Sequence, residues 1–414
     1  MINSSGKEKS RLEILYDGYY YDVTDFVRRH PGGREIIGFF THPNEDATLP
    51  IQQFHARSLD KVNGIMRTLK RRQMEDIPEI SSKDKEIQTR NNVLTEDFTK
   101  LYLELKAEGL FHPSYFHVAW RLIEMLFLGF LGFYVITHHS NHWIKILGCF
   151  ILAMAQGRAG WLMHEGGHFS LTGNPKVDRS LQVYIMGIFV GISGILWRRH
   201  HNLHHAMTQR IGKDSDLDAS PIFLFNINML DAPNQANHLL YRYQLWFLPF
   251  LGPIVALYYI IWESWRYLQK YRVGQEIFSI GIYYLIVYWI GFWPWIFTNC
   301  ISVSYLHFNF GLSHTHLPVT DKPTHWVEHG LVHTADVDQR PWCDWWMGYL
   351  NYQIEHHLFP TMPQFRNKLA VDRVRALANK HGLPYYVYSY REAVMKMVYN
   401  MWDVTQQVKQ LPRN

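Results

Sequence analysis

The sequence is poor in cysteine, and this scarcity excludes two kinds of site. Only three cysteines occur among 414 residues, at Cys149, Cys300 and Cys343. Three scattered thiols cannot build the disulfide framework of a small secreted domain, and they cannot form a cysteine-based metal site. Any metal bound by this chain must therefore use other ligands.

Other features are also missing. The first twelve residues carry charges but no apolar stretch of the kind that directs secretion, so we expect the N-terminal part to stay in the cytosol. The chain has no internal repeat, no low-complexity tract and no basic block. Its net charge of +5 suits attraction to anionic lipid, and we expect no nucleic-acid partner.

The chain is instead rich in apolar and aromatic residues, which make up 47% and 15% of it. The first hundred residues are polar, and five apolar runs follow, at 118–135, 143–162, 181–196, 245–262 and 277–301. A membrane span needs about 20 residues, so several runs are long enough to cross a bilayer. The third run is marginal and fits an interfacial or re-entrant helix. Four crossings would leave both ends in the cytosol, and the cations after the third and fourth runs favour that side.

We interpret residues 1–75 as a small soluble domain, 76–100 as a linker and 101–414 as a membrane domain. Tyr16 and Tyr19 lie in a strand-like stretch that the turn signal Asp17-Gly18 interrupts. The linker is rich in Lys, Arg, Glu, Asp and Ser, and a short helix is expected after it, over 101–110.

Histidine is abundant, with 24 in the chain, and most of the informative ones fall into three clusters. The clusters read HEGGH, HNLHH and QIEHH, and their candidate metal ligands are His164, His168, His201, His204, His205, Gln353, His356 and His357. Residues three or four apart share one face of a helix, so each cluster can present its ligands together. One such pair is usually solvated, but three clusters of the same pattern indicate a metal site.

The number of ligands indicates two ions. A zinc site needs about four ligands, and the clusters offer seven histidines and Gln353. Imidazole suits iron and zinc equally, so the ligand type leaves the metal open. The electron-transfer module described below favours iron, because zinc has no use for electrons.

The three clusters, in this order, resemble the histidine boxes of membrane fatty acid desaturases. Gln353, the stretch NYQIEHHLFPTMP at 351–363 and SLTGN at 170–174 are similar to the front-end subfamily. Its members insert a double bond between an existing double bond and the carboxyl end. The resemblance implies a mainly α fold, with a multi-span transmembrane helical domain, a cytosolic helical cap and a small α+β domain in front.

The resemblance also implies one further histidine ligand between the last apolar run and the third box. By position we choose His314, with His316 and His333 as alternatives, and His200 is an alternative to His201. Two carboxylates inside the boxes, Glu165 and Glu355, either orient ligands or lie on a helix surface.

A second motif lies near the N-terminus. His30-Pro31-Gly32-Gly33, followed by Asp46-Ala47-Thr48 and Phe54-His55, resembles the cytochrome b5 domain. There His30 and His55 would bind haem b from opposite faces. His42 competes for the second position, but it lies close to His30 and precedes a proline. With both axial positions filled, the haem iron should carry electrons and not bind oxygen.

These resemblances imply a front-end desaturase of polyunsaturated fatty acid biosynthesis, an enzyme with two non-haem irons, haem b and dioxygen as co-substrate. Its acyl substrate would be carried on coenzyme A or a phospholipid, and NADH-cytochrome b5 reductase would supply electrons. The expected location is the endoplasmic reticulum membrane, crossed several times, with both termini in the cytosol.

The position of the new double bond would depend on an apolar tunnel that fixes the acyl chain. Its candidate wall residues are Trp161, Trp197, Phe308 and Phe310. An acidic run follows the second box, at Asp214, Asp216 and Asp218. It could contact a headgroup or carry protons, and we favour a solvated run.

Three rival functions use the same features. A fatty acyl or sphingolipid desaturase or hydroxylase has the same di-iron site, although QIEHH argues against a hydroxylase. A non-catalytic electron carrier and a zinc-dependent membrane hydrolase are the others.

Overall fold

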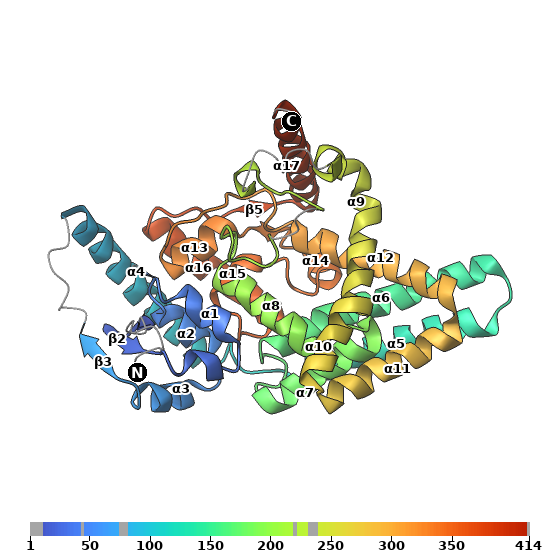
Figure 1. Cartoon of the computed structure of the whole chain (residues 1–414), viewed down its shortest axis with the longest axis horizontal. Coiled ribbons are helices and arrows are strands. Elements are labelled where there is room, and N and C mark those ends of the chain that lie inside the picture. The colour runs from blue at the N-terminus through green and yellow to red at the C-terminus, as the bar shows by residue number, and fades with distance from the viewer. Residues whose placement is uncertain (1–10, 43–44, 74–81, 218–221, 231–238, 412–414) are drawn as a thin grey trace, which may run out of the picture.

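The computed structural model describes residues 11–42, 45–73, 82–217, 222–230 and 239–411, with the backbone alone at 82–85 and 248–256. The fold is mainly helical, as expected, and a small sheet lies in the N-terminal part. Figure 1 shows this part at the left and an arm of long helices, α5, α6, α11 and α12, at the right. The C-terminal helices lie above the junction of the two.

The N-terminal domain is built on three antiparallel strands in the order β1-β2-β3, which are β1 (Glu13–Tyr16), β2 (Tyr19–Asp22) and β3 (Arg71–Gln73). Asp17 and Gly18 both have positive φ, 50° and 75°, which confirms the turn between the first two strands. Four short helical segments connect β2 to β3: η1 (Val27–Arg29), α1 (Arg34–Phe39), α2 (Thr48–Phe54) and α3 (Leu59–Met66). The domain is therefore α+β, as the sequence indicated.

The segment expected to be a linker is largely helical. Helix α4 spans Ser82–Ala107, far more than the short helix expected over 101–110. One face of α4 is apolar, because Leu94, Phe98, Leu101 and Leu105 recur at helical spacing, and all four are buried. They pack against the C-terminal helices, so the polar composition of this segment describes only its outer face.

Among the described residues, two helices are long and apolar enough to cross a membrane, α5 (Tyr115–His138) and α6 (His142–Gly167). They pack closely because glycines lie between them: a Cβ added to Gly132 would come within 2.6 Å of the Leu152 nitrogen. Small residues allow such close approach between membrane helices. The N-cap side chains of Ser114 and Asn141 accept hydrogen bonds from the first turns.

The third and fifth apolar runs are bent. The third forms α7 (Pro175–Ile185), η3 (Met186–Val190) and α8 (Gly194–Ala206), with a bend of 108° before α8. This agrees with an interfacial or re-entrant segment. The fifth run is divided between two helices, and α11 (Gly274–Ile290) and α12 (Phe292–Gly311) meet at 120°.

The break in the fifth run falls at Gly291, whose φ of 83° favours glycine. Counting each bent pair as one span gives up to four spans, and the number four stays a prediction. The fourth run is helical, as α9 (Leu239–Tyr258) and η6 (Tyr259–Glu263), and α10 (Ser264–Tyr271) follows it.

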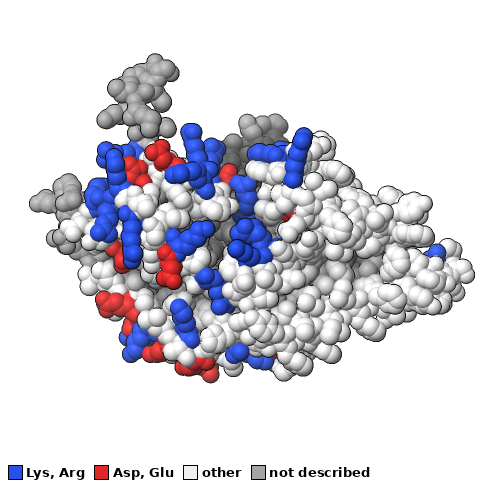
Figure 2. Space-filling model, turned by 90° about the horizontal axis from the view of Figure 1, so that it is seen from below, with Lys and Arg blue, Asp and Glu red and all other residues white. Residues whose placement is uncertain are grey.

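Charge divides the surface into two halves. Figure 2 shows Lys, Arg, Asp and Glu gathered over the half that carries the N-terminal domain, while the helical arm is almost entirely white. Large apolar side chains are exposed along that arm, among them Phe116, Phe130, Trp143, Leu285 and Trp293. An exposed apolar surface of this extent is expected of helices surrounded by lipid.

The C-terminal part forms a helical cap where the arm meets the charged half. After η4 (Ile227–Met229) and the α9–α12 region come α13 (Trp326–His333), α14 (Pro341–Trp346), α15 (Gln353–Leu358), η7 (Gln364–Leu369), α16 (Val371–Lys380) and α17 (Tyr390–Gln410). A short parallel pair, β4 (Asp336–Val337) and β5 (Val387–Tyr388), ties the start of the cap to its end.

The N-terminal domain docks directly on α8 and the loop after it. Ala206 and Met207 belong to the same buried apolar cluster as the core of the N-terminal domain. Buried Glu45 accepts a hydrogen bond from the Arg210 guanidinium and lies 3.4 Å from the Lys213 ammonium. A second ion pair joins the more exposed Glu35 to Arg199 at 3.6 Å.

These contacts predict which side chains hold the N-terminal domain on α8 and the loop after it. Glu45→Ala leaves the Arg210 guanidinium buried without its partner, a change that costs about 3–5 kcal/mol in comparable pairs. We expect a clear fall in thermal stability and faster hydrogen exchange at α1 and α8, measured by calorimetry and mass spectrometry in detergent.

Glu35→Ala is the matched control. The Glu35 side chain is 52% exposed, and such a pair contributes about 0–1 kcal/mol. Equal effects of the two substitutions would contradict the docking role of Glu45.

Candidate metal centre

The histidine clusters lie on three helices that are distant in sequence and meet in the structure. HEGGH closes α6, HNLHH lies in α8 and QIEHH begins α15. The glycines of the first cluster let α8 approach, because a Cβ on Gly167 would lie 2.9 Å from the Trp197 ring. His314 joins from the turn that follows α12.

The side chains form two buried groups, each with its ligand nitrogens within 4.8 Å of one another. The five-histidine group contains His164, His168, His201, His205 and His356. The three-histidine group contains His204, His314 and His357. The two groups share the helices α8 and α15, so the structure brings together every histidine proposed from the boxes and places them as two neighbouring sites.

Gln353 belongs to the three-histidine group. Its amide nitrogen lies 3.1 Å from His314 Nε2 and 3.3 Å from His357 Nε2. The two ends of an amide differ only in their hydrogen-bonding partners, and exchanging them would place an oxygen ligand at this point. The glutamine therefore stands where the other boxes place a histidine.

The nitrogens are arranged as ligands of an ion. His205 Nε2 lies 3.0 Å from His201 Nε2 and 3.1 Å from His356 Nε2. Imidazoles bound at about 2.0–2.1 Å around one metal have nitrogens about 3.0–3.4 Å apart. Within the described chain, His164 Nε2 and His168 Nε2 are buried without a hydrogen-bond partner. Buried lone pairs facing one another are costly, and a cation between them removes the cost.

Burial keeps the cap histidines neutral. Desolvation lowers the pKa of His314 to about 3 and the pKa values of His356 and His357 well below their usual range. A neutral imidazole has a lone pair free for a metal, and a protonated one does not. These rings are therefore ready to bind metal at neutral pH.

In the three-histidine group, the ring nitrogens that face away from the other ligands are held by neighbours. His204 Nδ1 lies 2.9 Å from a carboxylate oxygen of Asp214, and His314 Nδ1 lies 3.1 Å from the His333 carbonyl oxygen. His357 Nδ1 lies 3.1 Å from the Thr208 hydroxyl. Such partners fix the ring orientation and the tautomer of a metal ligand.

The first box is held in a similar way. The Gln364 side chain lies 2.5 Å from His164 Nδ1, and its backbone N–H donates to the Glu165 carboxylate at 3.1 Å. Glu165 therefore orients His164 through Gln364. The Tyr385 hydroxyl donates to Glu355 at 2.7 Å. Both glutamates are buried, so the alternative of a helix-surface carboxylate was wrong for each.

The alternative ligands lie elsewhere. His200 points toward Tyr259, and His316 lies beside Tyr388. His333 contributes its carbonyl group and not its ring, whose Nδ1 lies 2.7 Å from the Pro318 oxygen. Among the described residues, none of these three histidines belongs to either group.

The acidic run was only partly interpreted correctly. The expectation of a solvated run is wrong for Asp214, which is buried against His204 because it holds that ring. The side chain of Asp216 is 56% exposed. Asp218 lies outside the described residues.

In the N-terminal domain the proposed haem ligands face each other. The rings of His30 and His55 are 6.1 Å apart between centroids. Two imidazoles on opposite faces of one iron have centroids about 6 Å apart, so the spacing fits a bis-histidine haem. Burial lowers the pKa of His55 to about 4, which leaves its lone pair free. His42 is exposed and is not part of this pair.

The aromatic residues proposed as tunnel walls lie in two different places. Trp161 and Phe310 pack against each other, and Phe310 and Trp197 both lie against His164. Phe308 packs elsewhere, against the apolar cluster around Leu312. Trp197 and Phe310 therefore lie against the histidine groups, Trp161 packs behind Phe310, and Phe308 lies elsewhere.

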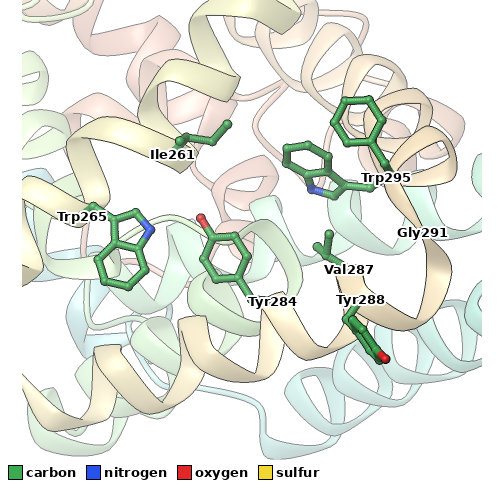
Figure 3. A pocket seen from close by; sticks show the side chains of 8 residues that line it. Ile261, Trp265, Tyr284, Val287, Tyr288, Gly291 and Trp295 are labelled. Atoms are coloured by element: carbon green, nitrogen blue, oxygen red, sulfur yellow. The ribbon is translucent and has the colours of Figure 1, made fainter.

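Two cavities lie in the helical arm. One, of about 280 Å³, lies among α5, α6, η3, α11 and α12, and Leu152 and Gln156 of α6 line it two to three turns before His164. The other, of about 580 Å³, is an open hollow near Gly291, with Trp265 and Tyr284 beside each other (Figure 3). Trp295 lines both.

No sequence pattern pointed to Gln364 or Thr208 as partners of the ligands. Each lies outside the helical repeat that identified the clusters, and each reaches its histidine only because distant elements pack together. The only hint for Gln364 is that it directly follows the stretch at 351–363.

Comparisons with known proteins agree with this geometry. Residues 141–389 match the family described as fatty acid desaturase, and residues 3–86 match the cytochrome b5-like heme/steroid binding domain. The chain is 38% identical over 411 residues to an acyl-lipid (8-3)-desaturase of Rebecca salina, covering 96% of this chain and 92% of that protein.

Two further relatives have similar coverage. An acyl-lipid (8-3)-desaturase of Thraustochytrium sp is 34% identical, with 95% of this chain and 92% of that protein covered. The fatty acid desaturase 2-like protein FADS2B of Mus musculus is 30% identical, with 90% and 78% covered.

The two groups predict a sharp contrast between neighbouring histidines. His201→Ala should lower the metal content of the purified protein and abolish its activity, because it removes one of five converging nitrogens. His200→Ala, one residue away and directed elsewhere, should change neither by more than about twofold. Metal analysis of both variants checks this, and equal metal loss would contradict the assignment.

Proposed function

The chain belongs to the fatty acid desaturase family and carries a fused cytochrome b5-like domain, and we propose that it is a front-end desaturase. It inserts a cis double bond into an unsaturated fatty acyl chain, between an existing double bond and the carboxyl end. The observation that carries this proposal is the pair of buried imidazole groups placed between an apolar helical arm and a docked haem-type domain.

The acyl chain is carried on a lipid in this proposal. The relatives from Rebecca salina and Thraustochytrium are named acyl-lipid desaturases, and the similarity covers nearly the whole chain. An acyl chain in a bilayer can reach the arm from the side, which suits its exposed apolar surface.

The bound metals are two irons, and the ligands are the nine residues of the two groups. Iron is favoured over zinc because a domain of the electron-carrying cytochrome b5 type is fused to the site. Haem b is held by His30 and His55. When bound, the two irons supply the activation of dioxygen that is needed to remove hydrogen from an unactivated methylene.

The protein contributes position and a dry environment. Asp214, Thr208 and Gln364 hold the outer nitrogens of ligand rings, so the inner nitrogens stay directed at the metals. Trp197 stacks on His201 with centroids 4.4 Å apart and covers the site on one side. Excluding water protects the reacting groups from side reactions.

Regioselectivity depends on how the acyl chain is fixed, because successive methylenes are chemically alike. The cavity of about 280 Å³ along α6 lies on the lipid side of His164 and is apolar in most of its lining. We place the methyl end of the acyl chain there, which leaves the carboxyl end toward the charged half. An error of about 1 Å in such placement costs much of the rate.

The proposed cellular location follows from the division of the molecule into a charged half and an apolar arm. The N-terminal domain and the cap lie together on the charged half, and we place both in the cytosol, at the endoplasmic reticulum membrane. There the NADH-dependent cytochrome b5 reductase delivers electrons to the haem domain.

A hydroxylase with the same metal centre is the closest alternative function. Feeding defined polyunsaturated fatty acids to a yeast that expresses the chain separates the two. We expect products that have lost two hydrogens, with the new double bond on the carboxyl side, as shown by mass spectrometry and chromatography. A product that has gained one oxygen would support the hydroxylase and contradict the proposal.

The cavity predicts a change in chain-length preference. Ile286 lines the cavity of about 280 Å³, and Ile286→Trp should fill part of it, so the use of longer acyl chains should fall several-fold relative to shorter ones. Leu285→Trp is the control, because Leu285 is exposed on the lipid side and does not line the cavity. An unchanged product ratio in Ile286→Trp would place the acyl chain elsewhere.

A further inference from the structure

Phe54 lies between the two cofactor sites without belonging to either. It directly precedes His55 in the chain, at the last position of α2. Its ring also lies against His205, a member of the five-histidine group, with centroids 6.5 Å apart and planes at 79°. Phe54 is therefore joined through the backbone to a proposed haem ligand, and its ring lies beside a proposed iron ligand.

The line of aromatic rings continues beyond His205. The His205 ring stacks on His357, a member of the three-histidine group, at 4.1 Å and 13°. The path from His55 through Phe54 and His205 to His357 thus connects the haem site with both metal sites. It contains one residue that has no metal to bind, and that residue is aromatic.

Several contacts hold Phe54 in this position. Trp326 of α13 packs against its ring, with centroids 5.8 Å apart. On the other side of His55, the Arg57 guanidinium donates to the carbonyl oxygens of Phe111 at 2.5 Å and Thr361 at 3.2 Å. Leu49, at the start of α2, belongs to the apolar cluster of the cap. The segment is fastened at both ends to the membrane domain.

This fastening matters because electron transfer depends on a short and constant gap. A freely diffusing donor must dock for every electron, but a docked domain keeps the same rings in contact. The ion pair of Glu45 with Arg210 and the shared apolar cluster hold the domain in this arrangement.

We propose that Phe54 is the positioning residue for electron transfer from the haem to the iron pair. Phe54 is bonded to His55 through the backbone and has its ring beside His205, and it sets the rate at which electrons cross between the two ligands. This inference rests on the proposed function, since it needs the haem and the irons to be bound at the histidines named above.

The electrons balance as follows. In each transfer the haem iron is oxidised from ferrous to ferric, and one iron of the pair is reduced from ferric to ferrous, with no bond made or broken in the relay. Two transfers serve one turnover. The acyl chain supplies two further electrons and two protons from its two C–H bonds, and two protons come from water. Together these reduce dioxygen to two molecules of water.

The test compares Phe54→Leu with Phe54→Tyr in the full chain purified with haem and iron. The haem is first reduced anaerobically with NADH and cytochrome b5 reductase. The reduced protein is then mixed with dioxygen and acyl lipid, and the reoxidation of its haem is followed by absorbance. We expect reoxidation to slow by about tenfold or more in Phe54→Leu and to stay near the wild-type rate in Phe54→Tyr, since small displacements between reacting groups have effects of this order.

Phe39→Leu is the matched control. Phe39 is a partly buried aromatic residue of the same domain, and its ring lies 5.7 Å from the Lys213 ammonium across the same interface. It is not on the path between the ligands, so its replacement should leave the rate unchanged. In all variants the haem absorbance spectrum and midpoint potential should match those of the wild type.

A second measurement separates the relay from damage to the metal centre. Excess chemical reductant reduces the irons without using the haem, and a single turnover then forms product. Phe54→Leu should give the wild-type yield under these conditions. A lower yield would place the lesion at the metal centre and overturn the relay.

Two other results would also overturn it: wild-type reoxidation in Phe54→Leu, or a rate in Phe54→Tyr as slow as in Phe54→Leu. If the wild-type haem itself fails to be reoxidised by dioxygen and substrate, the proposed function fails and the relay fails with it. If the wild type responds and Phe54→Leu responds equally, only the relay fails.

Discussion

Buried imidazole nitrogens that face one another dominate this structure. Eight histidines from α6, α8, α15 and the turn after α12 direct their nitrogens into two small volumes that water does not reach. The arrangement is unfavourable by itself, because the inner ring nitrogens lose their hydration and face one another. The packing of the surrounding helices and the bonds to outer ring nitrogens stabilise this arrangement, which is suited to a cation.

The N-terminal domain docks beside the same histidine groups. Its ion pairs and apolar contacts fall on α8 and on the loop after it, the part of the chain that also carries the second histidine cluster. A domain bound anywhere else would leave a longer gap between the two cofactor sites. Fusion in one chain gives the electron donor a high effective concentration, and docking gives it one orientation.

The lipid-facing arm supplies what an acyl substrate needs. Its outer surface is apolar, its helices pack closely through glycine, and its interior holds a cavity that Leu152 and Gln156 of α6 line. Polar and charged groups are concentrated where the arm meets the cap. The histidine groups therefore lie where the apolar arm meets the polar part of the molecule (Figure 2).

The sequence by itself determined the features that depend on neighbours within one helix or turn. Three features are local, and the sequence pattern predicted them: the spacing of His164 and His168, the turn at Asp17-Gly18 and the haem-type motif. The mainly α fold and the membrane character follow from apolar runs for the same reason. The short helix expected at 101–110 was wrong in its length, and the bend in the fifth run at Gly291 was not foreseen, because composition does not report a buried helical face or a bend at one glycine.

Only the tertiary structure decided how the ligands are shared. His204 and His205 are adjacent in α8, yet they serve different groups, because consecutive side chains on a helix point about 100° apart. Which direction faces which site depends on how α8 packs against α6 and α15. The choice of His314 over its neighbours, the burial of Asp214 and the contact between Phe54 and His205 were decided in the same way. Each joins residues far apart in the chain, and no local pattern encodes such a distance.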